Sequence, residues 1–154
     1  MTLVKGINEK VYKIIGSCME IHKVLGPGHP VDLYRRALEV ELLLKGLSFE
    51  AKKSVQVIYK DVMVGTVDID FLIDNEVILE VRSEETLKDT EVQQILRYLS
   101  LFGSSVGVLV NFGGLKVQYK RILPSRQQKD VRKNHYHLAD YREIGKTREG
   151  NPII

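Results

Sequence analysis

Residues 67–83 read VDIDFLIDNEVILEVRS, and two kinds of side chain alternate along this stretch. Apolar residues take seven of the odd positions: Val67, Ile69, Phe71, Ile73, Val77, Leu79 and Val81. Apart from two apolar exceptions, at 72 and 78, the even positions carry charge: Asp68, Asp70, Asp74, Glu76, Glu80 and Arg82. A period of two predicts two half-buried strands joined by a short turn.

The length of that turn decides which charged residues face each other. A two-residue turn at Asp74-Asn75 pairs residue 73 with 76 and puts Asp70 and Glu80 on opposite faces. A three-residue turn centred on Asn75 pairs 73 with 77 and Asp70 with Glu80, and it alone puts all seven apolar residues on one face. Asparagine also suits the left-handed conformation that such a turn needs. We therefore expect the three-residue turn, with the two carboxylates opposite each other and their Cβ atoms about 5 Å apart.

This register gathers a compact charged cluster of Asp68, Asp70, Glu80 and Arg82. Facing carboxylates repel, so they need a cation, a raised pKa or a basic neighbour. One interpretation is a salt-bridge network that faces solvent. The other is a Mg²⁺ site, because hard divalent cations prefer carboxylate oxygens and promote reactions of phosphate esters.

The rest of the chain predicts further helices and strands around this hairpin. Apolar spacing indicates a helix from Asn8 to a stop at Gly26-Pro27-Gly28, and a second from Asp32 to Gly46. Later patterns predict a turn at Lys60-Asp61 and further elements, namely strands at 54–59, 62–73, 76–82, 105–112 and 115–123 and a helix at 87–103. This order predicts a mixed α/β (α+β) domain with an antiparallel meander flanked by helices, and not a βαβ alternation.

Composition and charge bound the class of protein. The chain has 154 residues, 44% hydrophobic and 28% charged, which fits one domain at 1–123. Residues 124–154 hold the whole net charge of +3, as a mildly basic tail that suits either a polyanion or plain solvent. No apolar run could span a membrane, and MTLVKGINEK lacks a signal peptide's apolar stretch. The single cysteine, Cys18, is expected to be buried, and a chain with one cysteine suits a reducing compartment. These features predict a cytoplasmic protein without a membrane partner.

Several common chemistries lack their motifs here. No G-x-G-x-x-G follows a predicted strand, and neither a P-loop nor a G-x-S-x-G elbow is present. The absence of C-x-x-C and H-E-x-x-H makes zinc chemistry a poor fit.

The charged hairpin resembles the signature of the PD-(D/E)XK nuclease superfamily, an acid on one strand and E-x-K on the next. More narrowly, the chain resembles the GxxExxY proteins, small prokaryotic members of that superfamily. The resemblance spans roughly residues 7–123 and is carried by these pieces: MEIHKVLGPG (19–28), the Gly28 to Tyr34 spacing, AL and EL within 37–42, VGTVDIDFLI (64–73), VILEVR (77–82), Q and RYL within 94–99, and VNFGG to KRI within 110–122.

This resemblance implies a PD-(D/E)XK nuclease-like fold and metal-dependent cleavage of nucleic acid, with Mg²⁺ or Mn²⁺ as cofactor. Matched by position, Asp70, Glu80 and the carbonyl of Val81 would be the metal ligands. Gln94 and Tyr98 match a Q-x-x-x-Y helix motif, although an ordinary amphipathic helix explains their spacing equally well.

Two positions depart from the family pattern. Val31 stands where the family has a glutamate, and we interpret the neighbouring Asp32 as a helix N-cap. Arg82 stands where the family has a lysine. Arginine keeps the positive charge and can stabilise developing phosphate charge, but it is planar and never deprotonated. It could also neutralise Asp70 and Glu80 by itself, in place of the ion.

Other acidic and imidazole side chains are weaker site candidates. Glu20 and Glu41 are accessory carboxylates at most, with a helix surface role as the alternative for Glu41. We interpret His22 as a core histidine rather than a ligand. His135 and His137 are interpreted as exposed tail residues.

The leading hypothesis is a Mg²⁺- or Mn²⁺-dependent nuclease in which Asp70 and Glu80 hold the metal. In this hypothesis Arg82 is an electrostatic stabiliser of the phosphate charge and Gln94 is a positioning group. A second hypothesis is a catalytically inactive module on the same fold that binds nucleic acid or a protein. A third is a structural or oligomerising protein that binds neither. DNA or RNA, endo or exo action and a homo-oligomeric state are left open by the sequence.

Overall fold

A computed structural model of the chain describes residues 3–104 and 106–124. The predicted tail, with His135 and His137, lies outside the described residues apart from its first position. In the described residues, five strands form one sheet in the order β1-β2-β3-β4-β5. Along the chain, the helices and strands of the described residues follow in this order: α1 (Leu3–Leu25), α2 (Val31–Leu44), β1 (Phe49–Tyr59), β2 (Val62–Ile73), β3 (Val77–Arg82), α3 (Asp89–Phe102), β4 (Val106–Asn111) and β5 (Gln118–Ile122).

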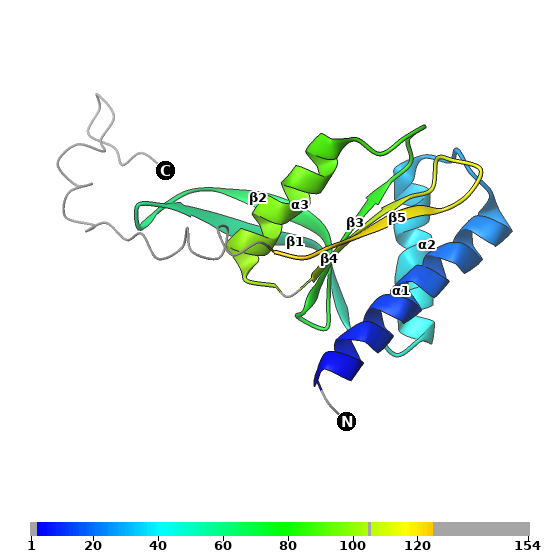
Figure 1. Ribbon diagram of the computed structural model, residues 1–154, viewed down its shortest axis with the longest axis horizontal. Coiled ribbons are helices and arrows are strands. Elements are labelled where there is room, and N and C mark those ends of the chain that lie inside the picture. Colours follow the sequence, from blue (N-terminus) through cyan, green and yellow to red (C-terminus); the bar gives the residue numbers. More distant parts are fainter. Residues whose placement is uncertain (1–2, 105, 125–154) are drawn as a thin grey trace.

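Helices cover both faces of the sheet near its centre (Figure 1). Residues of α1 and α2 pack on one face, in a cluster that includes Ile14, Cys18 and Leu38. On the other face, α3 packs on a second cluster through Ile95 and Leu99. The buried position predicted for Cys18 is confirmed, since none of its surface is exposed. The mixed α+β architecture predicted from the sequence is thereby confirmed.

The β2–β3 turn has the predicted length. Ile73 pairs with Val77, Leu72 with Ile78 and Phe71 with Leu79, which is the register of the three-residue turn. Asp74 and Asn75 have positive φ angles of 50° and 56°. The turn predicted at Lys60-Asp61 is also present, with φ angles of 49° and 66°. The burial pattern and the turn residues therefore specify the same pairing.

The apolar residues of this hairpin do not all face one way, contrary to our prediction. Phe71 packs in the α1–α2 cluster, whereas Ile69, two residues earlier, is buried in the α3 cluster. The alternation changes at Asp70, where pairing with β3 has ended. Lys52, between the β1 residues that pair with Phe71 and Ile69, has a positive φ of 53°, so the pleat is irregular at this point on both strands.

One connection differs from the predicted meander. β3 and β4 are parallel, from Val77–Val106 to Arg82–Asn111, and α3 is the crossover between them. This βαβ unit requires a helix to return the chain to the same end of the sheet. Gly107 makes the crossover close-fitting, because a Cβ there would lie 2.5 Å from Cγ2 of Ile95 on α3.

The helix starts also differ from prediction. α1 begins at Leu3, so Asn8 lies inside it and accepts a hydrogen bond from Arg121 instead of capping the helix. Pro30 is the N-cap of α2, and Asp32 is already helical. Proline fits this place because its fixed φ already matches the helix entry, where no N–H is needed.

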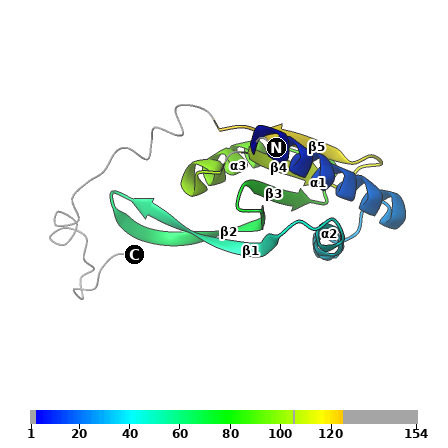
Figure 2. The same ribbon diagram turned by 90° about the horizontal axis from the view of Figure 1, so that it is seen from below.

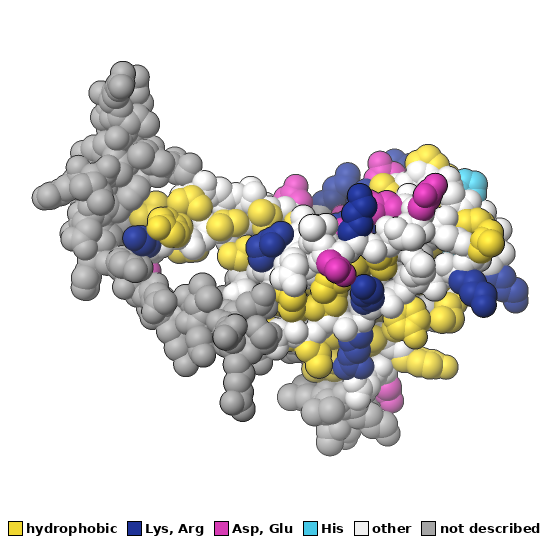
Figure 3. Space-filling view, turned by 45° about the horizontal axis from the view of Figure 1, so that its top comes forward, with side chains coloured by type: hydrophobic (Ala, Val, Ile, Leu, Met, Phe, Trp, Pro, Cys, Tyr) yellow, Lys and Arg dark blue, Asp and Glu magenta, His cyan; other side chains and the backbone are white. Residues whose placement is uncertain are grey.

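A two-stranded arm projects from the compact part of the molecule. The far ends of β1 and β2 extend away from α1 and α2 in both ribbon views (Figures 1 and 2). Hydrophobic side chains are visible along this arm in the space-filling view (Figure 3). Three large hydrophobic residues of β1 and β2 are exposed, namely Ile58, Tyr59 and Val64. None of the helices in the described residues combines the length and apolar character that crossing a membrane requires.

Candidate functional site

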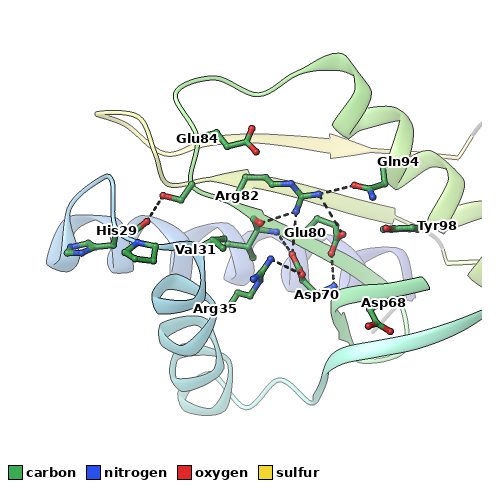
Figure 4. Close-up of a pocket in the computed structure, with 13 residues that line it drawn as sticks. His29, Val31, Arg35, Asp68, Asp70, Glu80, Arg82, Glu84, Gln94 and Tyr98 are labelled. Carbon is green, nitrogen blue, oxygen red and sulfur yellow. Dashed lines mark hydrogen bonds and ion pairs between the residues drawn. The ribbon is translucent and has the colours of Figure 1, made fainter. Parts of the chain in front are cut away.

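A pocket of about 450 Å³ opens where β2 and β3 part (Figure 4). One wall comes from the start of α2, at His29 to Val31, and the opposite wall comes from Gln94 and Tyr98 on α3. The charged cluster predicted from the hairpin forms its floor. The fold thus brings the predicted hairpin and the predicted Q-x-x-x-Y residues to one place.

The two facing carboxylates replace the missing rungs between the strands. Beyond the Phe71–Leu79 pair, Glu80 Oε2 accepts a hydrogen bond from the Asp70 amide at 2.6 Å. Asp70 Oδ2 accepts one from the Val81 amide at 2.8 Å. Each side chain therefore satisfies a backbone donor of the opposite strand, as buried amides require. Both carboxylates are held in fixed orientations by these bonds.

One guanidinium group reaches every predicted metal ligand. Arg82 Nη1 donates to the Val81 carbonyl at 3.0 Å and lies 3.5 Å from Asp70 Oδ2. Its Nη2 lies 3.9 Å from Glu80 Oε1. Asp70, Glu80 and the Val81 carbonyl thus converge on a place where a positive charge is stabilised.

The same arginine is held from behind by α3. Arg82 Nη2 donates to Gln94 Oε1 at 2.9 Å, and Nε donates to Glu91 Oε1 at 3.1 Å. The other Glu91 oxygen accepts from the Lys88 amide at the start of α3. Gln94 and Glu91 therefore anchor the guanidinium from the α3 side, next to the carboxylates.

A second arginine, which the sequence did not lead us to predict, also contacts the site. Arg35 Nη2 lies 3.2 Å from Asp70 Oδ1, and its Nη1 donates to Asp32 at 2.7 Å. Arg35 is one helical turn after Val31, so the two share a face of α2. That spacing was the available signal, because Val31, where the resemblance implies an acid, also lines the pocket.

The electrostatics of the floor centre on Glu80. Burial, followed by the neighbouring Asp70 charge, raises the pKa of Glu80 from its ordinary 4.5 to about 8. The hydrogen bond from the Asp70 amide and the charge of Arg82 lower the pKa of Glu80 but do not offset burial. Burial also raises the pKa of Tyr98. A carboxyl with such a shift, in a pocket with a defined charge partner, is typical of a functional site.

Asn111, at the end of β4, fixes the loop after β3. Its side chain is fully buried, accepts from the Glu84 amide and donates to the Glu84 carbonyl and to Gln118. Ser83 donates to the carbonyl of His29 across the pocket mouth. Only the V-N-F-G-G match pointed at Asn111, and it gave no role. In the fold it shapes the pocket rim beside Arg82.

Other predicted residues lie at varying distances from this floor. Val31 and exposed Asp68 line the pocket. Glu20 is exposed on α1 and Glu41 pairs with Lys45, and neither is among the described residues that line it. Within residues 3–104 and 106–124, no hydrogen bond or ion pair joins His22 to a carboxylate. Its Nε2 lies 2.9 Å from the Gly114 carbonyl and its ring stacks on Phe112, as a core histidine would.

The donor set suits a hard divalent cation. In residues 3–104 and 106–124, no group of three or more His, Cys, Asp or Glu side chains is arranged to hold a metal. Magnesium does not need such a group, because it is usually held by one or two carboxylates with waters and substrate phosphates. Asp70, Glu80 and the Val81 carbonyl provide that set, and the Arg82 guanidinium is a stand-in cation among them.

Comparison with known proteins identifies similarities in sequence and in fold. The profile of the PD-(D/E)XK nuclease superfamily matches residues 8–122. Among solved structures, the crystal structure of SSO0001 is similar to this chain with a TM-score of 0.51 and 21% sequence identity. The similarity covers 71% of this chain and 55% of that one, so this chain matches only about half of SSO0001. It shows a shared fold. No curated protein matches the sequence.

Proposed function

The chain belongs to the PD-(D/E)XK nuclease superfamily, and we propose that it is a divalent-cation-dependent nuclease that hydrolyses phosphodiester bonds of nucleic acid in this pocket. The observation that carries the proposal is the convergence of Asp70, Glu80 and the Val81 carbonyl on one cationic group. Membership of the GxxExxY group stays a prediction.

Each residue of the floor has a role in this proposal. Asp70, Glu80 and the Val81 carbonyl would hold Mg²⁺ or Mn²⁺, which supplies Lewis-acid stabilisation of charge on the phosphate. Arg82 donates hydrogen bonds to phosphate oxygens as negative charge develops on them. Gln94 positions the Arg82 guanidinium through the bond at 2.9 Å, and Tyr98 limits the access of water from the α3 side.

The test is Mn²⁺ binding measured by calorimetry, with wild type beside Asp70→Asn, followed by a cleavage assay on DNA and RNA. We expect binding and cleavage in the wild type and loss of both in Asp70→Asn. Asp89→Asn, at the exposed start of α3 outside the pocket, is the matched control and should behave as wild type. Unchanged metal binding and cleavage in Asp70→Asn would rule out the proposal.

A second function is favoured by the contacts of Arg82 itself. Its guanidinium already neutralises the floor, so the chain could bind nucleic acid without turnover. That alternative predicts salt-dependent binding to DNA or RNA with no cleavage in Mg²⁺ or Mn²⁺. Metal-dependent cleavage that disappears in Asp70→Asn excludes it.

A further inference from the structure

Asp70 is the most heavily contacted carboxylate of the pocket. Its Oδ2 accepts from the Val81 amide and lies 3.5 Å from Arg82 Nη1. Its Oδ1 lies 3.2 Å from Arg35 Nη2. Two guanidinium groups therefore occupy both oxygens of a proposed cation ligand. A divalent cation that binds Asp70 must compete with both positive charges.

Both arginines keep shorter contacts elsewhere. Arg82 is held by Gln94 at 2.9 Å and by Glu91 at 3.1 Å, and Arg35 by Asp32 at 2.7 Å. Their contacts with the floor carboxylates are longer, from 3.2 to 3.9 Å. In addition, the Nε donor of Arg35 is buried without a hydrogen-bond partner among the described residues. The guanidinium groups can thus turn from the floor and remain in the pocket.

The overall charge of the pocket creates the opposite problem for a phosphate. Besides Glu80, three carboxylates line it, from Asp68, Asp70 and Glu84, against the two arginines, so the excess of acid does not depend on the ionisation of Glu80. A phosphodiester that enters alone meets this excess of acid. A cation that enters alone meets the arginines. The cation neutralises the carboxylates that repel the phosphate, and the phosphate binds the guanidinium groups that repel the cation. Guanidinium groups bind phosphate oxygens bidentately, and carboxylates bind the cation.

We propose that a nucleic-acid phosphate and the divalent cation bind this pocket with positive coupling, because the phosphate draws the Arg35 and Arg82 guanidinium groups off Asp70 and frees its oxygens for the cation. This inference rests on the proposed function and adds that nucleic acid regulates metal binding at the same site. The site binds metal without substrate, and it should bind metal about tenfold more tightly when nucleic acid is present. By linkage, the cation tightens nucleic-acid binding by the same factor.

The experiment uses the full chain, Mn²⁺ and a labelled single-stranded DNA oligonucleotide with phosphorothioate linkages that resist cleavage. Calorimetry gives the Mn²⁺ affinity with and without saturating oligonucleotide. Fluorescence anisotropy gives the oligonucleotide affinity with and without Mn²⁺. We expect each ligand to tighten the other by about tenfold, within the range of typical coupling. The wild-type measurements alone decide whether the coupling exists.

A pair of neighbouring arginines on α2 tests the mechanism. Arg35→Gln should bind Mn²⁺ more tightly without oligonucleotide and show weaker coupling, because one competing charge is gone. Arg36→Gln is the matched control, since Arg36 is exposed and does not line this pocket, and it should keep the wild-type coupling. Circular dichroism checks that both variants are folded.

The outcomes separate the two proposals. Mn²⁺ binding that is equally tight with and without oligonucleotide, yet lost in Asp70→Asn, overturns the coupling and leaves the proposed function standing. No Mn²⁺ binding to the wild type under either condition overturns both. If the oligonucleotide affinity is the same with and without Mn²⁺, the arginines replace the ion permanently. That result also overturns the coupling.

Discussion

The same strand, β2, forms two hairpins that differ in how far they pair. With β1 it pairs along nearly its whole length, from Ile73–Phe49 to Val62–Tyr59. With β3 it pairs only from Ile73 to Phe71. The pocket lies where this second pairing stops. The comparison teaches that the site is built from an interrupted ladder, whose free amides are satisfied by the carboxylates that carry the proposed chemistry.

The largest effect is expected at the last pair before the interruption. Phe71 is 1% exposed and its ring lies 5.9 Å from that of Phe49, so Phe71→Ala should lower the free energy of unfolding by about 3–5 kcal/mol. Ile58→Ala, on the projecting arm where the side chain is 52% exposed, should cost no more than about 0.5 kcal/mol. Urea denaturation measures both, and equal losses would contradict the contrast.

A pH dependence is expected from Glu80, just beyond the interruption. Because the folded protein holds its proton more tightly, with the pKa raised from 4.5 to about 8, stability should fall as the pH rises through that interval. Glu80→Gln cannot ionise, so its stability should fall by about 1–3 kcal/mol less than that of the wild type between pH 5 and pH 9. Parallel curves of unfolding free energy against pH would show that Glu80 is not the group responsible.

Changes in the turn that sets the register of the interrupted hairpin should have a smaller effect on the free energy of unfolding. Asn75 has a φ of 56°, so Asn75→Ala should cost about 1 kcal/mol, whereas Asn75→Gly should be nearly neutral. Thermal unfolding of the two variants gives the difference. If alanine and glycine behave alike, the left-handed conformation is not what stabilises the turn.

The smallest effect is expected on the fully paired hairpin. Lys53 and Glu50 form an exposed ion pair on β1 at 2.9 Å, and Lys53→Gln should change stability by less than about 0.5 kcal/mol. The variant should also leave Mn²⁺ binding at the wild-type level. A larger change in either measurement would extend the functional region into the arm.

The sequence predicts the register of the β2–β3 hairpin but not the place where the two strands stop pairing. Seven apolar positions and a left-handed asparagine select the pairing of Ile73 with Val77, and these are local features. The end of pairing at Asp70 depends on side chains bonding to the opposite backbone, which no period reveals. For the same reason the switch of Ile69 to the α3 cluster was not predicted.

The parallel pair was missed although its signal was present. β3 and β4 read VILEVR and VGVLVN, and their almost continuous apolar runs are typical of central parallel strands covered on both faces. The order of the elements instead predicts a meander of antiparallel strands.

Two contacts between the helices and the floor were not predicted, for a different reason. Arg35 meets Asp70 across two elements, and Glu91 meets Arg82 from α3. Each residue alone has the composition of an ordinary helix surface. Only the packing of α2 and α3 against the same end of the sheet turns them into partners of the floor.

The projecting arm has a consequence for hydrogen exchange. Its far end carries half-exposed Ile58 and Tyr59, whereas its near end enters the core at Phe71 and Ile73. Amide protons along the β1–β2 ladder, which is irregular at Lys52 and between Val57 and Ile58, should therefore exchange at graded rates, fastest beside the Lys60-Asp61 turn and slowest at the junction with β3. A mass-spectrometric exchange profile of β2 would then record, residue by residue, how far the core's protection extends along a single strand.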